Sequence, residues 1–392
     1  MADRNLEVLL DGGLAAVLSR TERGSLFRYT DEFLASSEER IALHLPKTTG
    51  GILTEGLANL PSFFAGLLPE GVMLDAIVRK AHTSRGNLFE ILAATGADAI
   101  GDVTIGRPPT PGVNSVDAAI DLLTEFIDTP LSSMEGIAAI PGVQPKLSIG
   151  SAVKLLRYRT ERRAFIVKLS PPQFPMLAEN EHFSMSLARR CGLNVARTSL
   201  RRQALLVERF DLVFEAGTMH RIHIEDTLQI MDRYPADKYA VDFDEICSAV
   251  SGLKVSPAVI LDFLRQFVFS YLVGNGDLHA KNLSLMYDRS TKTWRSSPAY
   301  HIVSTLPYST LSGSDRMAIA LADESFGRYS RAEFVSFGSR FGLPPRVVNQ
   351  MVSWVADRFT SALGRLDPPD VFDSRCLSEM RSRAVELRSG PA

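Results

Sequence analysis

The segment from Gly274 to Tyr287, GNGDLHAKNLSLMY, constrains the fold more than any other part of the chain. An apolar segment with helical spacing begins at Phe263 and leads into it, and the strand-like run LSLMY ends it. Asp277 and Asn282 stand five positions apart in the polar stretch between these two apolar elements. The pattern predicts a helix, a short polar loop that carries an acid and an amide, and a strand.

Those two residues suit phosphoryl transfer, which needs a carboxylate near the proton of the nucleophile and an amide oxygen that can hold a metal ion. The spacing of Asp277 and Asn282, D-x-x-x-x-N, matches the catalytic loop of kinases. Asp and Asn also cap and turn chains. From this motif alone, an ordinary helix-to-strand loop explains the residues equally well.

The composition indicates a soluble, near-neutral protein. The 392 residues suffice for two or three domains, and the 43 basic and 45 acidic residues nearly balance, which argues against a nucleic-acid binder except through a local basic face. Three scattered cysteines without a C-x-x-C pair suggest a reducing compartment. The sequence contains neither a signal-peptide pattern nor an apolar run of about 20 residues, so a cytoplasmic location is expected.

The N-terminal region begins with strand-like runs, LEVLLD and LAAVLSR, and ALHLP around His44 is predicted as another strand. From Leu57 the spacing becomes helical, and NLFEILAATG predicts a helix that ends at Gly96. The proline-rich stretch 107–112 is the best linker candidate. We therefore expect domains at 1–107, 113–212 and 213–380.

The rest of the chain contains two further predicted strands, AFIVKLS around Val167 and ALLVERFD before Leu212, with a helix that ends near Gly192 between them. From Phe243 the pattern is mostly helical, apart from a hairpin near 288–294. The last segment, 381–392, is expected to fray.

Lys168 lies in the apolar strand pattern FIVKL, where burial is costly without an anionic partner. Kinases use such a lysine to grip nucleotide phosphates and pair it with a glutamate on a helix. Glu181 lies 13 positions later in the next predicted helix. Taken singly, a lysine that snorkels to water from an edge strand is the more common explanation.

The HIED motif carries two alternatives. His220 and His223 adjoin Glu225 and Asp226, but further zinc ligands at suitable spacing are not evident. A polar turn in which Asp226 or Thr227 caps a helix is the simpler interpretation.

Read together, the motifs GVQPK, FIVKL, NEHF, VERFD, HIED, GNGDLHAKN and PAYHIVS resemble the HipA family of toxin serine/threonine kinases. The likeness extends from residue 1 to about 365, and the combination is far more specific than any one motif. It implies an α+β fold with a protein-kinase-like two-lobed core, an N-terminal β-rich subdomain and a mostly helical C-terminal lobe.

The resemblance also implies ATP and Mg²⁺ as cofactors and assigns the site residues by position. Asp277 is the expected catalytic base and Asn282 a metal ligand. The remaining expected contacts to the nucleotide and its phosphates are Val143, Gln144, Lys146, Lys168, Glu208, Phe210, His279 and Lys281.

Family members are toxins, and their implied partners are a HipB-like helix-turn-helix antitoxin, which brings the toxin to DNA, and a protein substrate, an aminoacyl-tRNA synthetase in characterised members. Three functions are therefore weighed. They are a protein kinase toxin, a catalytically weak co-regulator that binds an antitoxin, and a small-molecule phosphotransferase, which the N-terminal region does not support.

Two positions depart from the family pattern. The usual metal-binding Asp after the hairpin is replaced by His301, and Mg²⁺ prefers hard oxygen ligands to imidazole. The usual autophosphorylated serine is replaced by Ala139. The sequence does not distinguish a natural replacement at 301 from an engineered one. The departure predicts little or no phosphoryl transfer by this chain.

Overall fold

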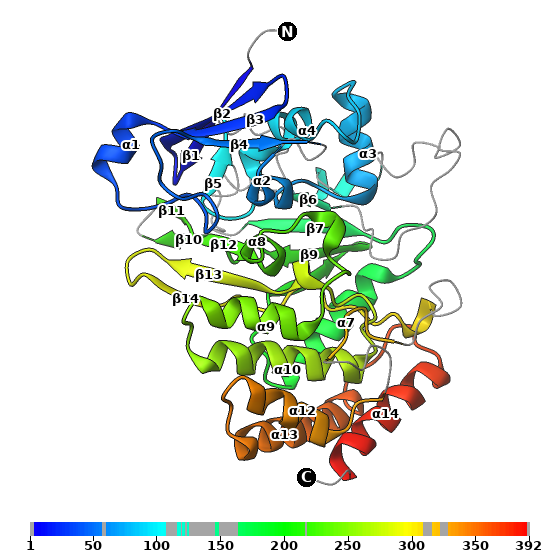
Figure 1. Ribbon diagram of the computed structural model, residues 1–392. Coiled ribbons are helices and arrows are strands. Elements are labelled where there is room, and N and C mark those ends of the chain that lie inside the picture. The colour runs from blue at the N-terminus through cyan, green and yellow to red at the C-terminus, as the bar shows by residue number, and fades with distance from the viewer. Residues whose placement is uncertain are drawn as a thin grey trace. The chain divides into compact units, whose positions relative to one another are not determined.

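The computed structural model describes residues 4–56, 60–106, 116–118, 120–121, 124, 146–148, 164–215, 218–308, 316–321 and 328–389 (Figure 1). The chain divides into two units that each draw on several stretches of sequence. The first comprises Met1–Val167, Glu208–Pro235 and Met286–Thr293, and the second comprises Lys168–Val207, Ala236–Leu285 and Trp294–Ala392. The domain boundaries expected near 107–113 and 212–213 remain predictions.

The first unit contains an antiparallel sheet in the order β4-β3-β2-β1-β5. Its strands are β1 (Asn5–Leu10), β2 (Gly13–Thr21), β3 (Gly24–Tyr29), β4 (Ile52–Glu55) and β5 (Val103–Ile105). Asp11 and Gly12 both have positive φ, 45° and 85°, which suits a tight hairpin between right-twisted strands. The strands predicted from LEVLLD and LAAVLSR are confirmed.

The helices of this region are α1 (Asp31–Ser36), α2 (Ser62–Gly66), α3 (Gly71–Lys80) and α4 (Leu88–Thr95), which continues into the 3₁₀ turn η1 (Gly96–Asp98). Of these, α1, α2 and α4 contribute side chains to the core under the sheet. Phe64 of α2 and Phe89 of α4 share a buried cluster with Phe27 of β3. The helix predicted to end at Gly96 is confirmed, because Gly96 is the C-cap of α4.

The strand predicted around His44 is wrong. Residues 41–45 form turns and irregular backbone. The buried Tyr29 hydroxyl accepts from the amide of Ile41 at 2.9 Å and donates to the carbonyl of Leu45 at 2.6 Å. The amide of Leu43 donates to the carboxylate of Glu225 at 2.8 Å. Side chains thus satisfy backbone groups that a strand would pair in a ladder.

The other strands form three small sheets. The four-stranded sheet has the order β6-β7-β9-β8, with β6 (Lys146–Ser148), β7 (Phe165–Leu169), β8 (Thr198–Arg201) and β9 (Ala204–Glu208). The two-stranded sheet pairs β10 (Leu212–Glu215) with β11 (Thr218–Arg221). The three-stranded sheet has the order β12-β13-β14, with β12 (His223–Asp226), β13 (Ser284–Asp288) and β14 (Thr293–Ser296). Both strands predicted around Val167 and before Leu212 are confirmed. Asp226 caps the short helix α8 (Thr227–Ile230) in a capping box with Gln229, as predicted. The predicted polar turn is wrong, because HIED is the buried strand β12.

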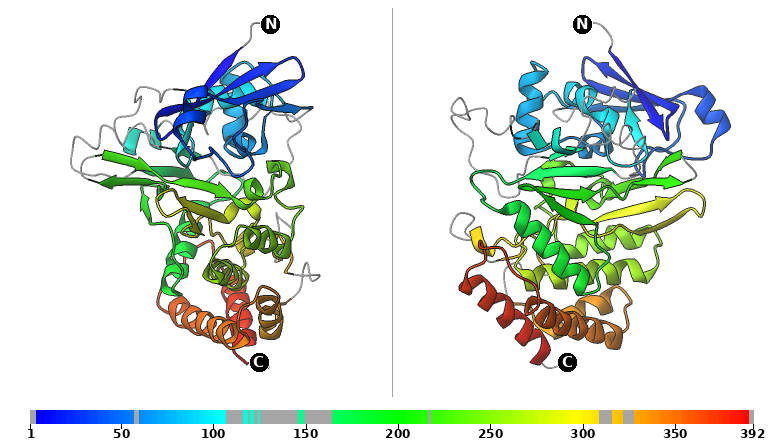
Figure 2. Two further views of the ribbon diagram at one scale, coloured as in Figure 1. Left: turned by 60° about the vertical axis from the view of Figure 1, so that its left-hand side comes forward. Right: turned by 180° about the vertical axis from the view of Figure 1, so that it is seen from behind.

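The second unit is mainly helical. Its helices are α7 (Leu177–Arg190), α9 (Phe243–Gly252), α10 (Pro257–Val273), α12 (Arg331–Arg340), α13 (Pro345–Leu363) and α14 (Ser374–Ser389), with 3₁₀ turns η4 (Ala280–Asn282) and η5 (Leu306–Tyr308). Figure 2 shows α12, α13 and α14 packed together in orange and red. Buried aromatic rings join α9 to its neighbours. The ring centre of Phe243 lies 4.7 Å from that of Phe267 of α10 and 5.0 Å from that of Phe337 of α12.

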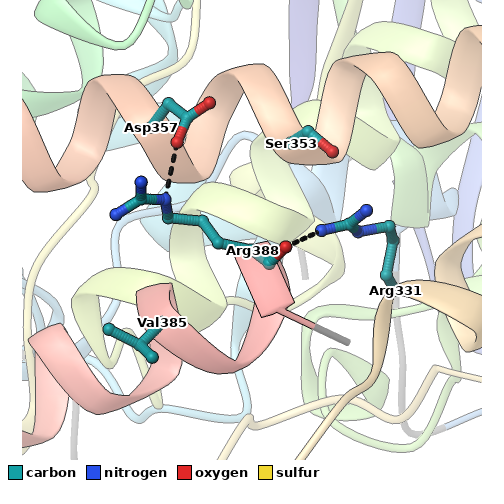
Figure 3. A pocket seen from close by; sticks show the side chains of 5 residues that line it. All are labelled: Arg331, Ser353, Asp357, Val385 and Arg388. Atoms are coloured by element: carbon teal, nitrogen blue, oxygen red, sulfur yellow. Dashed lines mark hydrogen bonds and ion pairs between the residues drawn. The ribbon is translucent and has the colours of Figure 1, made fainter. Parts of the chain in front are cut away.

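The expected fraying is wrong for 381–389, because α14 continues to Ser389. Arg331 donates to the carbonyl oxygens of Leu387 and Arg388, which satisfies acceptors that every helix C-terminus leaves exposed. Figure 3 shows the bond to Arg388. No helix in the described parts of the chain is both long and apolar enough to cross a membrane.

Helix α10 delivers the polar loop. Ser256 caps its start, Pro257 occupies its first turn, and most of its side chains are buried. It ends at Gly274, whose φ is +70°. A Cβ there would lie 2.5 Å from Cγ of Leu306, so both the backbone and the packing require glycine. The predicted helix, loop and strand around Asp277 are confirmed as α10, the loop with η4, and β13.

Candidate active site

The loop that carries Asp277 is held from both sides. The amide of Asp277 donates to the side-chain oxygen of Asn275 at 3.1 Å. The amide of Gly276 donates to the hydroxyl of Thr305 at 3.0 Å, and the Thr305 hydroxyl donates to the carbonyl of Gly274 at 3.1 Å. Asp277 is buried, and these bonds fix the backbone that presents its carboxylate.

Asn282 closes the 3₁₀ turn after this carboxylate. Its side-chain oxygen accepts from the backbone amide of His279 at 3.0 Å, and its backbone amide donates to the carbonyl of His279 at 2.9 Å. An amide oxygen has two lone pairs, so one remains for another donor or a cation. The neighbouring Lys281 contributes its carbonyl, which accepts from the hydroxyl of Tyr300 at 2.8 Å. Asn282 therefore acts as a turn cap and retains coordinating capacity.

Lys168 and Glu181 form a buried ion pair with 2.5 Å between Nζ and Oε1. Lys168 is only 4% exposed, so the alternative of an edge-strand lysine that snorkels to water does not hold, and the expected pairing with Glu181 is present. Burial acts to raise the pKa of Glu181, but the charges of Lys168 and His301 outweigh it and lower the pKa to about 2. Glu181 is thus a carboxylate that fixes the lysine in place.

His301 joins this pair to the loop. Its Nδ1 lies 3.2 Å from Nζ of Lys168 and 3.2 Å from Oε2 of Glu181. Its Nε2 lies 3.4 Å from Oδ2 of Asp277. The residue has a φ of +52°, a left-handed conformation that a non-glycine residue keeps only where its surroundings demand it.

Asn180 of α7 positions the segment that follows His301. Its side-chain amide donates to the carbonyl of Ser304 at 2.9 Å, and its oxygen accepts from the amide of Ser304 at 3.0 Å. Because both Asn180 and Ser304 are buried, this reciprocal pair ties the His301 segment to the helix that carries Glu181.

Tyr239 completes the surroundings of Asp277. Its hydroxyl donates to Oδ1 of Asp277 at 2.6 Å, and its ring meets the ring of His279 edge-on at 5.1 Å. Burial would raise the pKa of Asp277, yet the close contact with His301, the charges of His279 and His301 and the hydrogen bond from Tyr239 hold the pKa well below its usual range. Asp277 is therefore an ionised carboxylate.

The structure brings six of the residues singled out from sequence into this cluster in the second unit: Lys168, Glu181, Asp277, His279, Asn282 and His301. Glu208 ends β9 and Phe210 lies in the turn after it, both in the first unit. Lys146 begins β6. Val143, Gln144 and Ala139 lie outside the described residues.

Sequence reasoning missed Tyr239, Asn180 and Asn275. The two asparagines stand inside motifs that were recognised, NEHF and GNGD, where a buried polar residue was a usable signal. Tyr239 lies 38 positions before Asp277 in a stretch without any chemical motif, so only the tertiary structure reveals it.

The donors around Asp277 do not fit Mg²⁺ in the way that a kinase site requires. Asn282 supplies an amide oxygen, but the second expected ligand is the imidazole of His301, whose nitrogens face Lys168, Glu181 and Asp277 instead. Mg²⁺ demands oxygen ligands in octahedral geometry. Among the described residues, no group of three or more His, Cys, Asp or Glu side chains is arranged to hold a metal ion.

A separate hollow of about 490 Å³ lies among the C-terminal helices (Figure 3). Its lining comprises Arg331, Ser353, Asp357, Val385 and Arg388, none of which was singled out from the sequence. Arg388 is paired there with Asp357 at 2.6 Å. The hollow is thus lined by a helix-capping arginine and a surface ion pair.

Comparison with known proteins then places the chain among its relatives. The HipA-like C-terminal domain matches residues 138–363, more than half of the chain, and the HipA N-terminal domain matches residues 6–106. The chain belongs to the HipA family. The recognition of that family from sequence motifs is confirmed.

Relatives of similar length support the assignment. The chain is 28% identical to the putative kinase Y4dM of Sinorhizobium fredii, over 90% of each chain. It is 27% identical to the serine/threonine-protein kinase toxin HipA of Shewanella oneidensis, over 79% of this chain and 78% of the relative.

A solved structure has the same fold. It is a chain of the Shewanella oneidensis complex of HipA, HipB and its operator DNA, with a TM-score of 0.74, 23% identity, and coverage of 99% of this chain and 100% of that one. The HipA fold, with its α+β kinase-like character, is confirmed for this chain.

Proposed function

We propose that this chain is a toxin kinase of a toxin–antitoxin pair, built to transfer the γ-phosphate of ATP to a serine or threonine of a protein, in which His301 suppresses the transfer. The observation that carries the proposal is the buried cluster that joins the Lys168–Glu181 pair to Asp277 through His301. A buried lysine fixed by a glutamate beside an ionised carboxylate is the arrangement that phosphoryl transfer uses.

The residue roles follow from this chemistry. Lys168 would hold nucleotide phosphates, Glu181 would keep the lysine in place, and Asp277 would accept the proton of the attacking hydroxyl. By the family pattern, Val143, Gln144 and Lys146 would contact the nucleotide, and Glu208 with Phe210 would border the base. His279 and Lys281 would shape the loop around Asp277. Asn282 would offer an oxygen to the cation that accompanies ATP.

Nucleotide binding tests the proposal without requiring transfer. Replacing Lys168 by Ala or Met should weaken ATP binding by about 10- to 100-fold, because charge-assisted hydrogen bonds contribute about 1.5–3 kcal/mol. The measurement is calorimetric titration, with circular dichroism to confirm that the variant is folded. Lys47→Met is the matched control, since Lys47 is a half-buried lysine that donates to the carbonyl of Leu34 instead. Equal affinity of all variants would contradict the proposed role of Lys168.

The proposed substrate is an aminoacyl-tRNA synthetase, whose phosphorylation would stall growth, and the proposed compartment is the cytoplasm. The proposed partner is a HipB-like helix-turn-helix antitoxin. The Shewanella oneidensis relative, whose fold this chain shares, was solved with HipB and operator DNA, which supports this choice of partner.

A second function, a weak kinase that acts mainly as a co-regulator with the antitoxin, is favoured by one observation. His301 fills the expected metal position with a nitrogen ligand that already contacts Lys168, Glu181 and Asp277. In that case antitoxin binding and repression would persist while transfer is negligible.

DNA binding should depend on the antitoxin. The chain has a formal net charge of −2, so it offers little general attraction to phosphates. We expect the isolated chain to bind operator DNA weakly and the complex with the antitoxin to bind it tightly. Electrophoretic shifts over a salt series measure both. Tight, salt-dependent binding by the isolated chain would contradict this expectation.

A further inference from the structure

The C-terminal helix α14 contacts the end of α10, just before the loop that carries Asp277. Nη1 of Arg383 donates to the carbonyl of Tyr271 at 2.8 Å, and the guanidinium lies 5.0 Å from the centre of the Tyr271 ring. The amide of Gly274 donates to the same carbonyl at 3.2 Å. An arginine of α14 and the glycine that ends α10 therefore share one acceptor, and Asp277 follows that glycine by three positions.

The burial of Arg383 is not explained by its ion pair alone. Arg383 is 4% exposed, and its Nε donates to Oε1 of Glu379, one turn earlier on α14, at 2.8 Å. Glu379 keeps 23% of its side chain exposed, so it does not require a buried partner. A guanidinium is costly to bury unless its donors are satisfied, and the last turn of a helix carries partial negative charge that favours a cation. The end of α10 supplies both the acceptor and the charge.

A second arginine of α14 holds the other side of the same junction. Nη2 of Arg375 donates to the carbonyl of Leu306 at 3.0 Å. Leu306 is fully buried against Gly274 and directly follows Thr305. The amide and the hydroxyl of Thr305 both donate to the carbonyl of Gly274, at 2.8 and 3.1 Å. Helix α14 thus holds both of the chain segments that meet at Gly274.

We propose that Arg383 is a positioning residue for Asp277, which fixes the loop by anchoring the end of α10 to the C-terminal helix, with Arg375 as a second anchor. The inference rests on the proposed function, since it takes Asp277 as the base. Arg383 lies 112 positions after Tyr271 and acts through the backbone of Tyr271 and Gly274. A misplacement of about 1 Å in a catalytic group can cost about 10²-fold in rate, so a remote anchor of this kind affects the reaction.

Hydrolysis of ATP tests this role without a protein substrate. In this reaction the oxygen of water bonds to the γ-phosphorus, the bond from that phosphorus to the bridging oxygen breaks, Asp277 takes the proton, and ADP leaves. In the His301→Asp background, with Mg²⁺ added, Arg383→Met should lower the turnover of ATP about 10- to 100-fold. The KM for ATP should change by less than about twofold, because the proposed phosphate contact is Lys168 of β7. A raised KM with unchanged turnover overturns the proposal.

Two further variants separate positioning from a general structural role. Arg383→Lys should regain most of the lost turnover, because an ammonium group can still donate to the carbonyl of Tyr271. Arg328→Met is the matched control, since Arg328 is half exposed and pairs with the same Glu379 at 2.9 Å. It should leave turnover unchanged. An equal fall in Arg328→Met and Arg383→Met overturns the proposal.

Hydrogen exchange supplies a readout that does not depend on transfer. In the chain that retains His301, Arg383→Met should speed exchange at the amides of Gly274 and Asn275 about 10-fold or more, since the variant loses a charge-assisted bond at the end of α10. Exchange at the amide of Cys191, which donates to the carbonyl of Leu187 at 3.0 Å, should not change. Unchanged exchange in the loop, or an equal increase at Cys191, overturns the proposal.

The outcomes distinguish this inference from the proposed function. If the His301→Asp chain hydrolyses no ATP, the proposed function has failed, and the exchange rates decide whether Arg383 holds the loop. If Arg383→Met does not fold, Arg375→Met takes its place, because the side chain of Arg375 is 55% exposed. That variant should speed exchange at the amide of Gly276, which donates to the hydroxyl of Thr305. An unchanged rate at Gly276 then overturns the anchoring role of α14.

Discussion

Replacing His301 by Asp should raise phosphoryl transfer by about 10²- to 10³-fold, the scale of removing or restoring one essential electrostatic element in an active site. In the structure, the imidazole faces Lys168, Glu181 and Asp277 and brings no oxygen ligand. A carboxylate at this position would supply the negative charge and the oxygen that the cation accompanying ATP requires. The backbone accepts the change, because Asp tolerates a φ of +52° better than most residues.

The assay is transfer of labelled γ-phosphate to a panel of aminoacyl-tRNA synthetases, with growth after induction as a second readout. His301→Asn is the matched control, since it removes the ring without restoring a carboxylate, and it should stay inactive. Adding Asp277→Asn to the active variant should abolish the gain, which rules out a contaminating kinase.

Mg²⁺ alone supplies a readout without transfer. The cluster already holds the carboxylates of Glu181 and Asp277. A third carboxylate, at position 301, adds electrostatic repulsion that a bound divalent cation relieves. Thermal unfolding of His301→Asp should therefore shift upward with Mg²⁺ much more than that of the unaltered chain. Equal activity and an equal response to Mg²⁺ in both forms would mean that another residue supplies the ligand.

The second large effect concerns the buried His223 in the first unit. Its Nδ1 lies 2.8 Å from Oδ1 of Asp102 and its Nε2 lies 2.9 Å from Oε1 of Glu225. Arg289 donates to the other oxygen of Asp102 at 2.6 Å and to Glu39 at 2.7 Å. With carboxylates on both nitrogens, the imidazole is held as the doubly protonated cation. The network links β12 to β13 and to the turns of the N-terminal region.

Removing Asp102 from this network should cost about 3–5 kcal/mol, because the buried His223 would keep its charge with one partner fewer and the half-buried Arg289 would lose one of its two carboxylates. Urea unfolding of Asp102→Ala measures the loss. Glu38→Ala is the control, since Glu38 is 91% exposed in its pair with Lys292 and should cost less than about 1 kcal/mol. A loss for Asp102→Ala no larger than that of the control would show that the network contributes little.

The stability contributed by His223 should also depend on pH. Burial would lower the pKa of His223, but Asp102 and Glu225 outweigh it and raise the pKa to about 9, from an ordinary value of 6.5. Between these values the folded chain binds a proton that the unfolded chain releases, so this contribution falls as pH rises. It is complete below about pH 6.5, lost through about pH 9, and worth about 3 kcal/mol. His223→Gln should flatten the profile, and an equal slope in both chains would contradict the assignment.

Local patterns were enough for the elements that frame the site. Helical spacing in α10, a cap at Ser256 and a glycine at 274 all act within a few residues, so the helix, the loop with Asp277 and the strand β13 could be predicted. The same holds for β7 and α7, which placed Lys168 and Glu181 on a strand and a following helix. The family motifs added residue roles that spacing alone left open.

Long-range pairing decided the remainder. The run that contains Ile41 and Leu43 looks strand-like. In the structure, however, the backbone amide of Leu43 donates to Glu225, 182 positions away, and that of Ile41 donates to the Tyr29 hydroxyl. No local pattern encodes these side-chain acceptors. The contacts of the site are also long-range. Lys168 meets Glu181 and His301, which lie 13 and 133 positions later, and Tyr239 donates to Asp277, 38 positions later. Sequence fixes which groups are available, and only the packed chain decides which of them share a buried volume, because desolvation and charge act through space.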